Sequence, residues 1–252
     1  MRQILVYADL GVAPSCLEHT ITSLQNEITN YCIRKCSAQE LLCSDWEEMT
    51  DLLVIPGGRD LPYHQKLFPL ATRRISQYVA GGGKYWGICA GGYFGAREIV
   101  FEQGSPLEIF GFRDLGFFPG KAIGPVFGTG LFRYESDEGL EAASLEWKSD
   151  DLEITCHTYY NGGCYFEALT EDANVRVLGR YADIPGQPAA IVDCRFGRGR
   201  AVLSGVHLEI SVHNWVNSSV KMQKVQPLLL SSHEARLRCL RSLINVILSK
   251  EI

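Results

Sequence analysis

The most informative segment of this chain is Lys84-Tyr85-Trp86-Gly87-Ile88-Cys89-Ala90-Gly91-Gly92-Tyr93-Phe94-Gly95. Its first half is an apolar run typical of a short buried strand, and its second half is expected to open a helix. Cys89 lies at the junction, with Gly87 two residues before it and Gly91 two residues after it. Small residues are needed on both sides because Cβ atoms would collide in so sharp a turn. The segment therefore predicts a strand–turn–helix unit that forces the Cys89 side chain outward from a strained backbone.

Two interpretations of Cys89 follow from this pattern. A G-x-C-x-G turn between a strand and a helix is the nucleophile elbow of α/β enzymes, with Cys in place of Ser. The N-terminus of the following helix would favour a thiolate. The alternative is a buried structural cysteine beside glycines that pack the helix, because matches to so short a pattern arise by chance. The other segments of the chain decide between the two.

Strands and helices alternate through roughly the first hundred residues. The expected elements are strands at 4–8, 31–35, 51–55 and 84–88, and helices capped by Ser15, at 38–42 and at 67–80. This alternation predicts a parallel sheet with helices on both faces. Ligands bind such sheets beyond the carboxyl ends of the strands. Pro56-Gly57-Gly58 and Cys89 both follow strands, so we expect them to be neighbours in space.

The pattern changes after about residue 98. Glycine and aromatic residues become dense up to residue 130, and residues 131–206 are typical of short strands and turns. Gly197-Arg198-Gly199-Arg200 predicts a hairpin turn, and apolar spacing predicts a final helix at about 232–249. No repeat or linker interrupts the chain, so we expect one α/β domain over residues 1–252 with β-rich insertions.

The composition narrows the class of protein. Of 252 residues, 46% are hydrophobic, which is enough for a large core, and a net charge of −5 without long runs of one sign argues against a nucleic-acid partner. No apolar stretch approaches the roughly 20 residues of a membrane span. Nine irregularly spaced cysteines and no signal-peptide layout predict free thiols, no metal site and a cytoplasmic location. We expect no cofactor.

His207 and Glu209 form the second part of the candidate site. They directly follow an apolar run at 201–205. Because they are two residues apart, their side chains project to the same side of an extended segment. A carboxylate beside an imidazole fixes its tautomer and stabilises its charged form. His207 would then take the proton of Cys89 and later protonate a leaving amine.

Backbone donors complete the predicted constellation. Gly57 and Gly58 would offer N–H groups to an oxyanion, and Ala90, just after the nucleophile, would add another. Nucleophile, base, orienting carboxylate and donors thus all follow strand ends. The sequence therefore predicts a catalytic site at one edge of the sheet.

These three segments resemble the signature segments of class I glutamine amidotransferase domains, in the same order along the chain. A closer resemblance, from near residue 3 to about residue 212, is to the amidotransferase-like N-terminal domain of eukaryotic biotin protein ligases. Its motifs here are Ile55-Pro56-Gly57-Gly58-Arg59-Asp60-Leu61-Pro62-Tyr63, Cys89-Ala90-Gly91-Gly92-Tyr93-Phe94-Gly95, Phe117-Phe118-Pro119-Gly120 and Tyr160-Asn161-Gly162-Gly163. The resemblance implies a flavodoxin-like core and a Cys-His-Glu triad that acts on a small amide-like substrate through a thioester.

Two positions depart from the family pattern. Relatives that use glutamine carry Gln where this chain has Tyr93, and their His-Pro-Glu is His207-Leu208-Glu209 here. A phenol cannot offer the paired donor and acceptor of an amide. The substrate is therefore left open, as is a non-catalytic ligand-binding or regulatory module that partners a biotin ligase or a synthase. A peptidase or hydrolase of the wider flavodoxin-like Cys-elbow group is a third reading, which the His-x-Glu pair disfavours.

Four side chains are candidates for substrate contact: Tyr93, Tyr160, Asn161 and Arg113. Tyr159, Tyr160 and Asn161 line a pocket or are ordinary strand and turn residues, and Arg113 with Asp114 forms a buried pair or contacts a ligand. The Gly-Arg-Gly-Arg at 197–200 is also a signature of biotin-ligase catalytic domains, but we interpret it as a turn. Too few residues follow 212 for a ligase domain, so we expect no biotin ligation by the chain itself.

Overall fold

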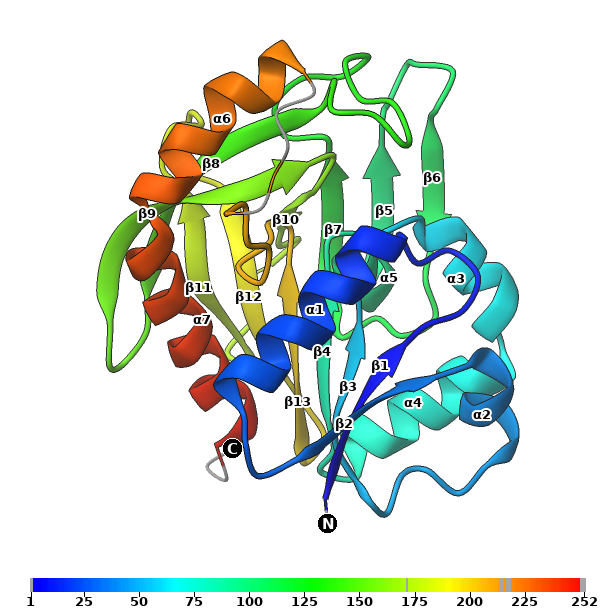
Figure 1. Ribbon diagram of the computed structural model, residues 1–252. Coiled ribbons are helices and arrows are strands. Elements are labelled where there is room, and N and C mark those ends of the chain that lie inside the picture. The colour runs from blue at the N-terminus through cyan, green and yellow to red at the C-terminus, as the bar shows by residue number, and fades with distance from the viewer. Residues whose placement is uncertain (1, 171, 214, 216–218, 250–252) are drawn as a thin grey trace.

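The computed structural model describes residues 2–170, 172–213, 215 and 219–249. In this part of the chain, a thirteen-stranded mixed sheet crosses the molecule in the order β2-β1-β3-β4-β13-β12-β10-β7-β5-β6, and β11, β8 and β9 extend it from β12 (Figure 1). The strands are β1 (Gln3–Tyr7), β2 (Cys32–Cys36), β3 (Thr50–Ile55), β4 (Lys84–Ile88), β5 (Ala96–Phe101), β6 (Ile109–Phe112), β7 (Phe118–Gly124), β8 (Leu140–Lys148), β9 (Glu153–Asn161), β10 (Tyr165–Glu167), β11 (Val175–Tyr181), β12 (Ala189–Phe196) and β13 (Gly199–Ser204).

The helices cover both faces of this sheet (Figure 1). They are α1 (Pro14–Glu27), α2 (Ala38–Cys43), α3 (Asp60–Leu67), α4 (Leu70–Ala80), α5 (Ala90–Gly95), α6 (Val220–Ser231) and α7 (His233–Leu248). The strands β2, β1, β3, β4 and β13 pair in parallel. The strands added after residue 98 are mostly antiparallel. The predicted parallel sheet with β-rich insertions is therefore confirmed.

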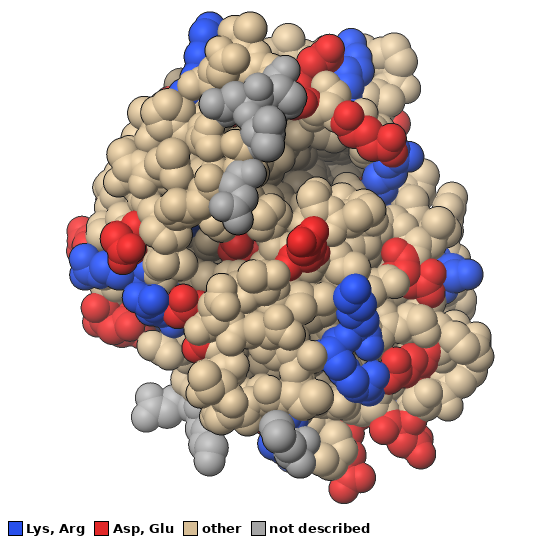
Figure 2. Space-filling view, in the orientation of Figure 1, with Lys and Arg blue, Asp and Glu red and all other residues tan. Residues whose placement is uncertain are grey.

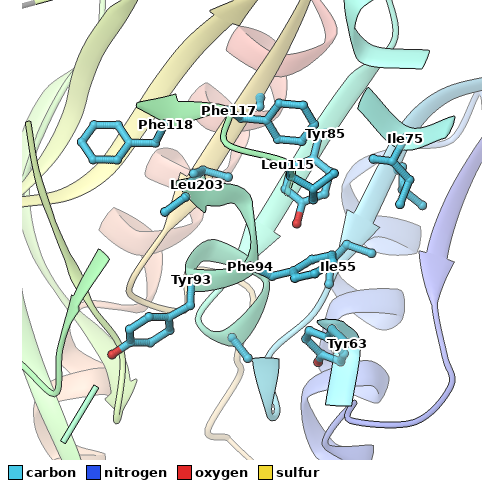
Figure 3. Close-up of a cluster of buried hydrophobic side chains, with 14 of the residues drawn as sticks. Ile55, Tyr63, Ile75, Tyr85, Tyr93, Phe94, Leu115, Phe117, Phe118 and Leu203 are labelled. Carbon is cyan, nitrogen blue, oxygen red and sulfur yellow. The ribbon is translucent and has the colours of Figure 1, made fainter. Parts of the chain in front are cut away.

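Alternation along the central strands divides the core in two. Leu5 and Tyr7 of β1 pack with α2, α3, α4 and α5 on one face, while Ile4 and Val6 pack with α1 and α7 on the other. This is what a strand buried on both faces requires, because successive side chains point to opposite sides. Figure 3 shows the first core, where Tyr93 and Phe94 of α5 lie beside Ile55 and Leu203. The short helix after Cys89 is thus fixed between strands and helices.

The helix boundaries differ from the prediction at two places. The segment 67–80 is not one helix, because α3 ends at Leu67 and α4 begins at Leu70. Phe68 precedes Pro69 and is extended, since a residue before proline disfavours the helical region. Ser15 is not the cap of α1. The helix begins one residue earlier at Pro14, whose ring presets the first helical φ, with Ala13 as N-cap.

The C-terminal predictions are confirmed. The residues between Phe196 and Gly199 form the turn of the β12–β13 hairpin, and α7 spans the expected final helix. Arg200 is buried, lies 3.0 Å from Asp193, and donates hydrogen bonds to Ser249 and to the carbonyl of Val246. The Gly-Arg-Gly-Arg motif therefore anchors the C-terminal end of α7 to the sheet.

Candidate functional site

Cys89 lies in the turn between β4 and α5 with a φ of 50° and a ψ of −106°, so the predicted strain is confirmed. Its N–H donates to the carbonyl of Ser204 at 2.7 Å, which ties the turn to the end of β13. Gly91 leaves no room for a side chain, because a Cβ there would lie 2.0 Å from the carbonyl oxygen of Ile55. Dense packing thus holds Cys89 in a conformation that costs about 1–3 kcal/mol.

His207 follows β13 and faces the same edge of the sheet. Its N–H donates to the carbonyl of Tyr159 at 2.9 Å, and its own carbonyl accepts from the Thr158 hydroxyl at 2.6 Å. Its Nδ1 lies 2.7 Å from Oε1 of Glu209, and both side chains are buried. With Nδ1–H donating to the carboxylate, Nε2 is left for chemistry.

The electrostatics of this pair favour a charged imidazole. Burial alone would lower the pKa of His207, but the charge of Glu209 and side-chain hydrogen bonds with Cys89 and Glu209 raise it well above its usual value. The pKa of His207 is therefore raised overall, and its ring interacts with both Cys89 and Glu209. Cys89 directly follows β4, and His207 and Glu209 both lie in the segment after β13.

The backbone around Gly58 is closely packed against the loop after β1. Gly58 has a φ of 154°, and a Cβ there would lie 2.1 Å from the carbonyl oxygen of Gly11. The neighbouring bonds run from Ala13 N–H to the carbonyl of Gly57 and from Arg59 N–H to the carbonyl of Gly11. Within the described residues, the N–H groups of Gly58 and Ala90 donate to no other backbone carbonyl.

Two cavities share Cys89 in their walls. The outer cavity has a volume of about 740 Å³ and is bounded by residues 10–16 at the start of α1, by the loop at 132–137, and by His207. The inner cavity is about 30 Å³ and is lined by Ala90 and four aromatic rings. Gly58, Arg59, Cys89, Phe132, Tyr134 and Asn161 line both. Figure 2 shows this face hollowed beside the N-terminal end of α1, with acidic and basic side chains interspersed around it.

The four candidate contact residues separate into two groups. Tyr93 lines the inner cavity with its ring while its hydroxyl donates to the carbonyl of Gly162 at 3.2 Å, and Asn161 lines both cavities. Tyr160 is 1% exposed and donates to the carbonyl of Gly163. Arg113 is 7% exposed and forms an ion pair with Asp60 at 2.6 Å. Tyr160 and Arg113 therefore support the site from behind and lie outside the residues that line it.

Four further residues contribute to the walls of the site. The Cys16 thiol lies close to His207, and burial raises its pKa to about 11. Tyr159 places its ring edge-on to the ring of His207 at 5.2 Å. Arg59 and Tyr134 stack at the mouth of the inner cavity. Arg59 belongs to the Pro-Gly-Gly motif and Tyr159 to a stretch already considered, but nothing local singles out Cys16 or Tyr134.

Other site types find no match in the described part of the chain. It contains no group of three or more His, Cys, Asp or Glu residues arranged to hold a metal ion. None of its helices is both long enough and apolar enough to cross a membrane. All nine cysteines are free thiols.

The amino-acid sequence of the chain is similar to those of known proteins. The model of a family described as "Biotin-protein ligase, N terminal" matches residues 2–250. A Chlamydia muridarum protein described as uncharacterized is 46% identical over 212 residues, which are 83% of this chain and 81% of the relative. The biotin–protein ligase of Schizosaccharomyces pombe is 37% identical over 212 residues, which are 82% of this chain and only 33% of the ligase.

Solved structures share the fold at low sequence identity. PurLQS from Thermotoga maritima superposes with a TM-score of 0.57 and 15% identity, covering 97% of this chain and 98% of that one. A ThuA-like protein from Bacteroides uniformis gives a TM-score of 0.52 and 11% identity, covering 94% of this chain and 91% of that chain. At such identities the likeness concerns the arrangement of strands and helices alone.

Proposed function

Because this chain belongs to the biotin-protein ligase N-terminal family and has the flavodoxin-like fold of class I glutamine amidotransferases, we propose that it is a cysteine-dependent enzyme acting on a carboxamide or other acyl C–N bond. The observation that carries the proposal is the meeting of a strained Cys89 with the hydrogen-bonded pair His207–Glu209 at one cavity. Nucleophile, proton carrier and orienting carboxylate are the parts that such chemistry needs.

The proposed reaction has two halves. His207 takes the proton of the Cys89 thiol as the sulfur attacks the carbonyl carbon, a C–S bond forms, and the oxyanion accepts hydrogen bonds from the N–H groups of Gly58 and Ala90. His207 gives its proton to the nitrogen, the C–N bond breaks, and ammonia or an amine leaves behind a thioester. Water, activated by the now neutral His207, then hydrolyses the thioester and releases the acid. No metal or cofactor takes part in either half.

A second candidate is a non-catalytic ligand-binding or regulatory module. The observation that favours it is Tyr93, whose hydroxyl bonds to the Gly162 carbonyl and so offers the cavity no paired donor and acceptor. Its partner would be a biotin ligase or a synthase subunit, since the related region of the yeast ligase is one third of a longer chain. The nine free thiols support a cytoplasmic setting for either candidate.

Turnover of short carboxamides, glutamine included, tests the proposal. We expect acid and ammonia to be released by the native chain and release to fall at least about a thousandfold in Cys89→Ser, because the weaker oxygen nucleophile lacks an ion-paired partner. Cys43→Ser, which removes an exposed thiol, is the control. Release that persists in Cys89→Ser would refute the proposal. Ligand binding without release from any carboxamide would favour the regulatory module.

A further inference from the structure

A pair of thiols lies away from the cavity, where α7 packs against β9 (Figure 1). Cys156 of β9 and Cys239 of α7 have their sulfur atoms 3.8 Å apart, and the two residues are 3% and 0% exposed. Among the described residues, which include all nine cysteines, this is the one hydrogen bond between two thiols. Two cysteines from elements far apart in the sequence thus meet in the interior.

The two thiols differ in their electrostatics. The hydrogen bond from Cys239 and the charge of Arg236 lower the pKa of Cys156, against the effect of burial. The same hydrogen bond and burial raise the pKa of Cys239. Cys156 is therefore the sulfur that gains thiolate character, whereas Cys239 keeps its proton and donates it to the hydrogen bond.

Arg236 supplies a buried positive charge beside the pair. It precedes Cys239 by three residues, so the two side chains are neighbours on the surface of α7. Arg236 is 1% exposed, and its guanidinium donates to the carbonyl of Leu229 at 2.9 Å. Burial lowers its pKa, and the charge of Cys156 opposes this effect more than that of any other group. A thiolate at Cys156 would therefore be compensated by a cation that is already in place.

The separation of the sulfur atoms is that of a hydrogen bond and leaves room for a covalent bond to form. An S–S bond is about 2.0 Å long, so the sulfur atoms must approach each other from 3.8 Å. Each sulfur moves by rotation about one Cα–Cβ bond, while the backbone of β9 and α7 stays in its regular conformation. Because both thiols are buried, the oxidant must be small. Hydrogen peroxide is close in size to a water molecule, whereas an oxidant as large as a peptide disulfide would require α7 to leave the sheet.

We propose that Cys156 and Cys239 are an oxidation site for hydrogen peroxide and close to a disulfide that ties α7 to β9. The Cys156 sulfur attacks one peroxide oxygen, the O–O bond breaks, and the other oxygen leaves as water with the Cys156 proton. The Cys239 sulfur then attacks the resulting sulfenic acid, an S–S bond forms, and the hydroxyl leaves as water with the Cys239 proton. The two thiols are oxidised to one disulfide, and one peroxide is reduced to two water molecules.

The proposed disulfide would lie on the strand that holds His207. The carbonyl of Tyr159 accepts the His207 N–H at 2.9 Å, and the Thr158 hydroxyl donates to the His207 carbonyl at 2.6 Å. Both residues follow Cys156 on β9 within three positions. Oxidation would therefore fasten α7 to the part of the sheet that supports the site. No step involves Cys89, so the inference is independent of the proposed function.

Peptide mass spectrometry after peroxide treatment tests the site. Remaining thiols are blocked with N-ethylmaleimide in denaturant, and the peptide that links Cys156 to Cys239 is measured over time. Cys164 and Cys194 are matched controls, because they are fully buried and burial raises the pKa of each. We expect the linked peptide to form at least roughly tenfold faster than either control is oxidised. Absence of the linked peptide, or equal oxidation of all four thiols, would overturn the proposal.

Single variants test the order of the two steps. In Cys239→Ser the serine still donates a hydrogen bond, but no thiol can attack the sulfenic acid, so we expect dimedone to trap it at Cys156. In Cys156→Ser we expect Cys239 to remain a thiol under the same treatment. Dimedone on Cys239, with Cys156 unmodified, would contradict the assignment of Cys156 as the attacking sulfur.

The native chain allows a measurement that needs no substitution. A disulfide that closes a loop of this length restricts the unfolded chain, so we expect the urea midpoint of peroxide-treated protein to exceed that of the same sample after dithiothreitol by roughly 1 M. Treated Cys156→Ser, which cannot form the bond, should show no such difference. A midpoint that does not rise although the linked peptide is present would show that the bond does not fasten the native α7 to β9.

Discussion

The protonation state of His207 links structure to chemistry at the scale of single residues. Its pKa is higher in the folded chain than in the unfolded one because Glu209 and Cys89 outweigh the effect of burial. Protonation therefore favours folding: the stabilising contribution is complete below the unfolded value of about 6.5 and is lost as the pH rises through the raised value.

Replacement of Glu209 tests directly how the protonation of His207 affects the site. In Glu209→Gln the charge that contributes most to raising the pKa of His207 is gone, so this pKa falls and a smaller share of the imidazole is charged at pH 6. We expect the alkylation rate of Cys89 at pH 6 to fall roughly tenfold, with a smaller deficit at high pH. Glu234→Gln, at an exposed position on α7, is the control. If the pH profile of the Cys89 alkylation rate were unchanged, Glu209 would not control the interaction of His207 with Cys89.

The elements explain why some residues were predictable and others were not. The elbow at Cys89 and the hairpin at 197–199 were predicted because their glycines leave few backbone alternatives. Each motif that predicted the family is one continuous stretch of sequence, and the family is confirmed. Helix α3 was missed because its apolar spacing is weak, and α6 because Pro227 lies inside it.

The walls of the cavity depend on contacts that no local pattern encodes. Cys16 approaches His207 because α1 begins at Pro14 and packs across the sheet, and Tyr134 reaches Arg59 through a loop 75 residues further along the chain. Arg113 looked equally suited to ligand binding or to a buried pair. Only the position of Asp60 at the start of α3 decides for the pair. The sequence could therefore not predict which residues of distant elements become neighbours at the site.

The Asp60–Arg113 pair should matter more for stability than for substrate binding. It joins the start of α3 to the residue after β6, and both side chains are less than 10% exposed. Asp60→Asn would leave a buried guanidinium without its counter-charge, and we expect a loss of about 3–5 kcal/mol in the free energy of unfolding. Urea denaturation measures this loss. The double variant Asp60→Leu, Arg113→Met should recover much of it, and a single variant as stable as the native chain would contradict the structural role.

The whole molecule is organised by one sheet. It runs from β2 at one edge to β6 at the other, and the segments at 10–16, 57–60, 132–137 and 207–209 all converge on the carboxyl end of β4 (Figure 1). The site is therefore built from parts of nearly the whole described chain. Loosening either half of the sheet should disturb it.

A sheet shared by both halves predicts one cooperative unfolding transition. Trp86 lies on central β4 and Trp147 on β8, and both are nearly fully buried. We expect variants that keep only one of these two tryptophans to report the same urea midpoint by fluorescence, because no linker separates their surroundings. Midpoints that differ clearly would indicate two independently folding parts.

The central claim is that Cys89 is an activated nucleophile, and competitive labelling tests it within a single sample. Cys89 is 8% exposed, whereas Cys32 and Cys43 are exposed on the surface. With limiting iodoacetamide at pH 7, we expect mass spectrometry to find Cys89 labelled ahead of both, because His207 beside it can take the thiol proton as the sulfur attacks. Labelling of Cys32 and Cys43 first, with Cys89 left unmodified, would contradict the claim.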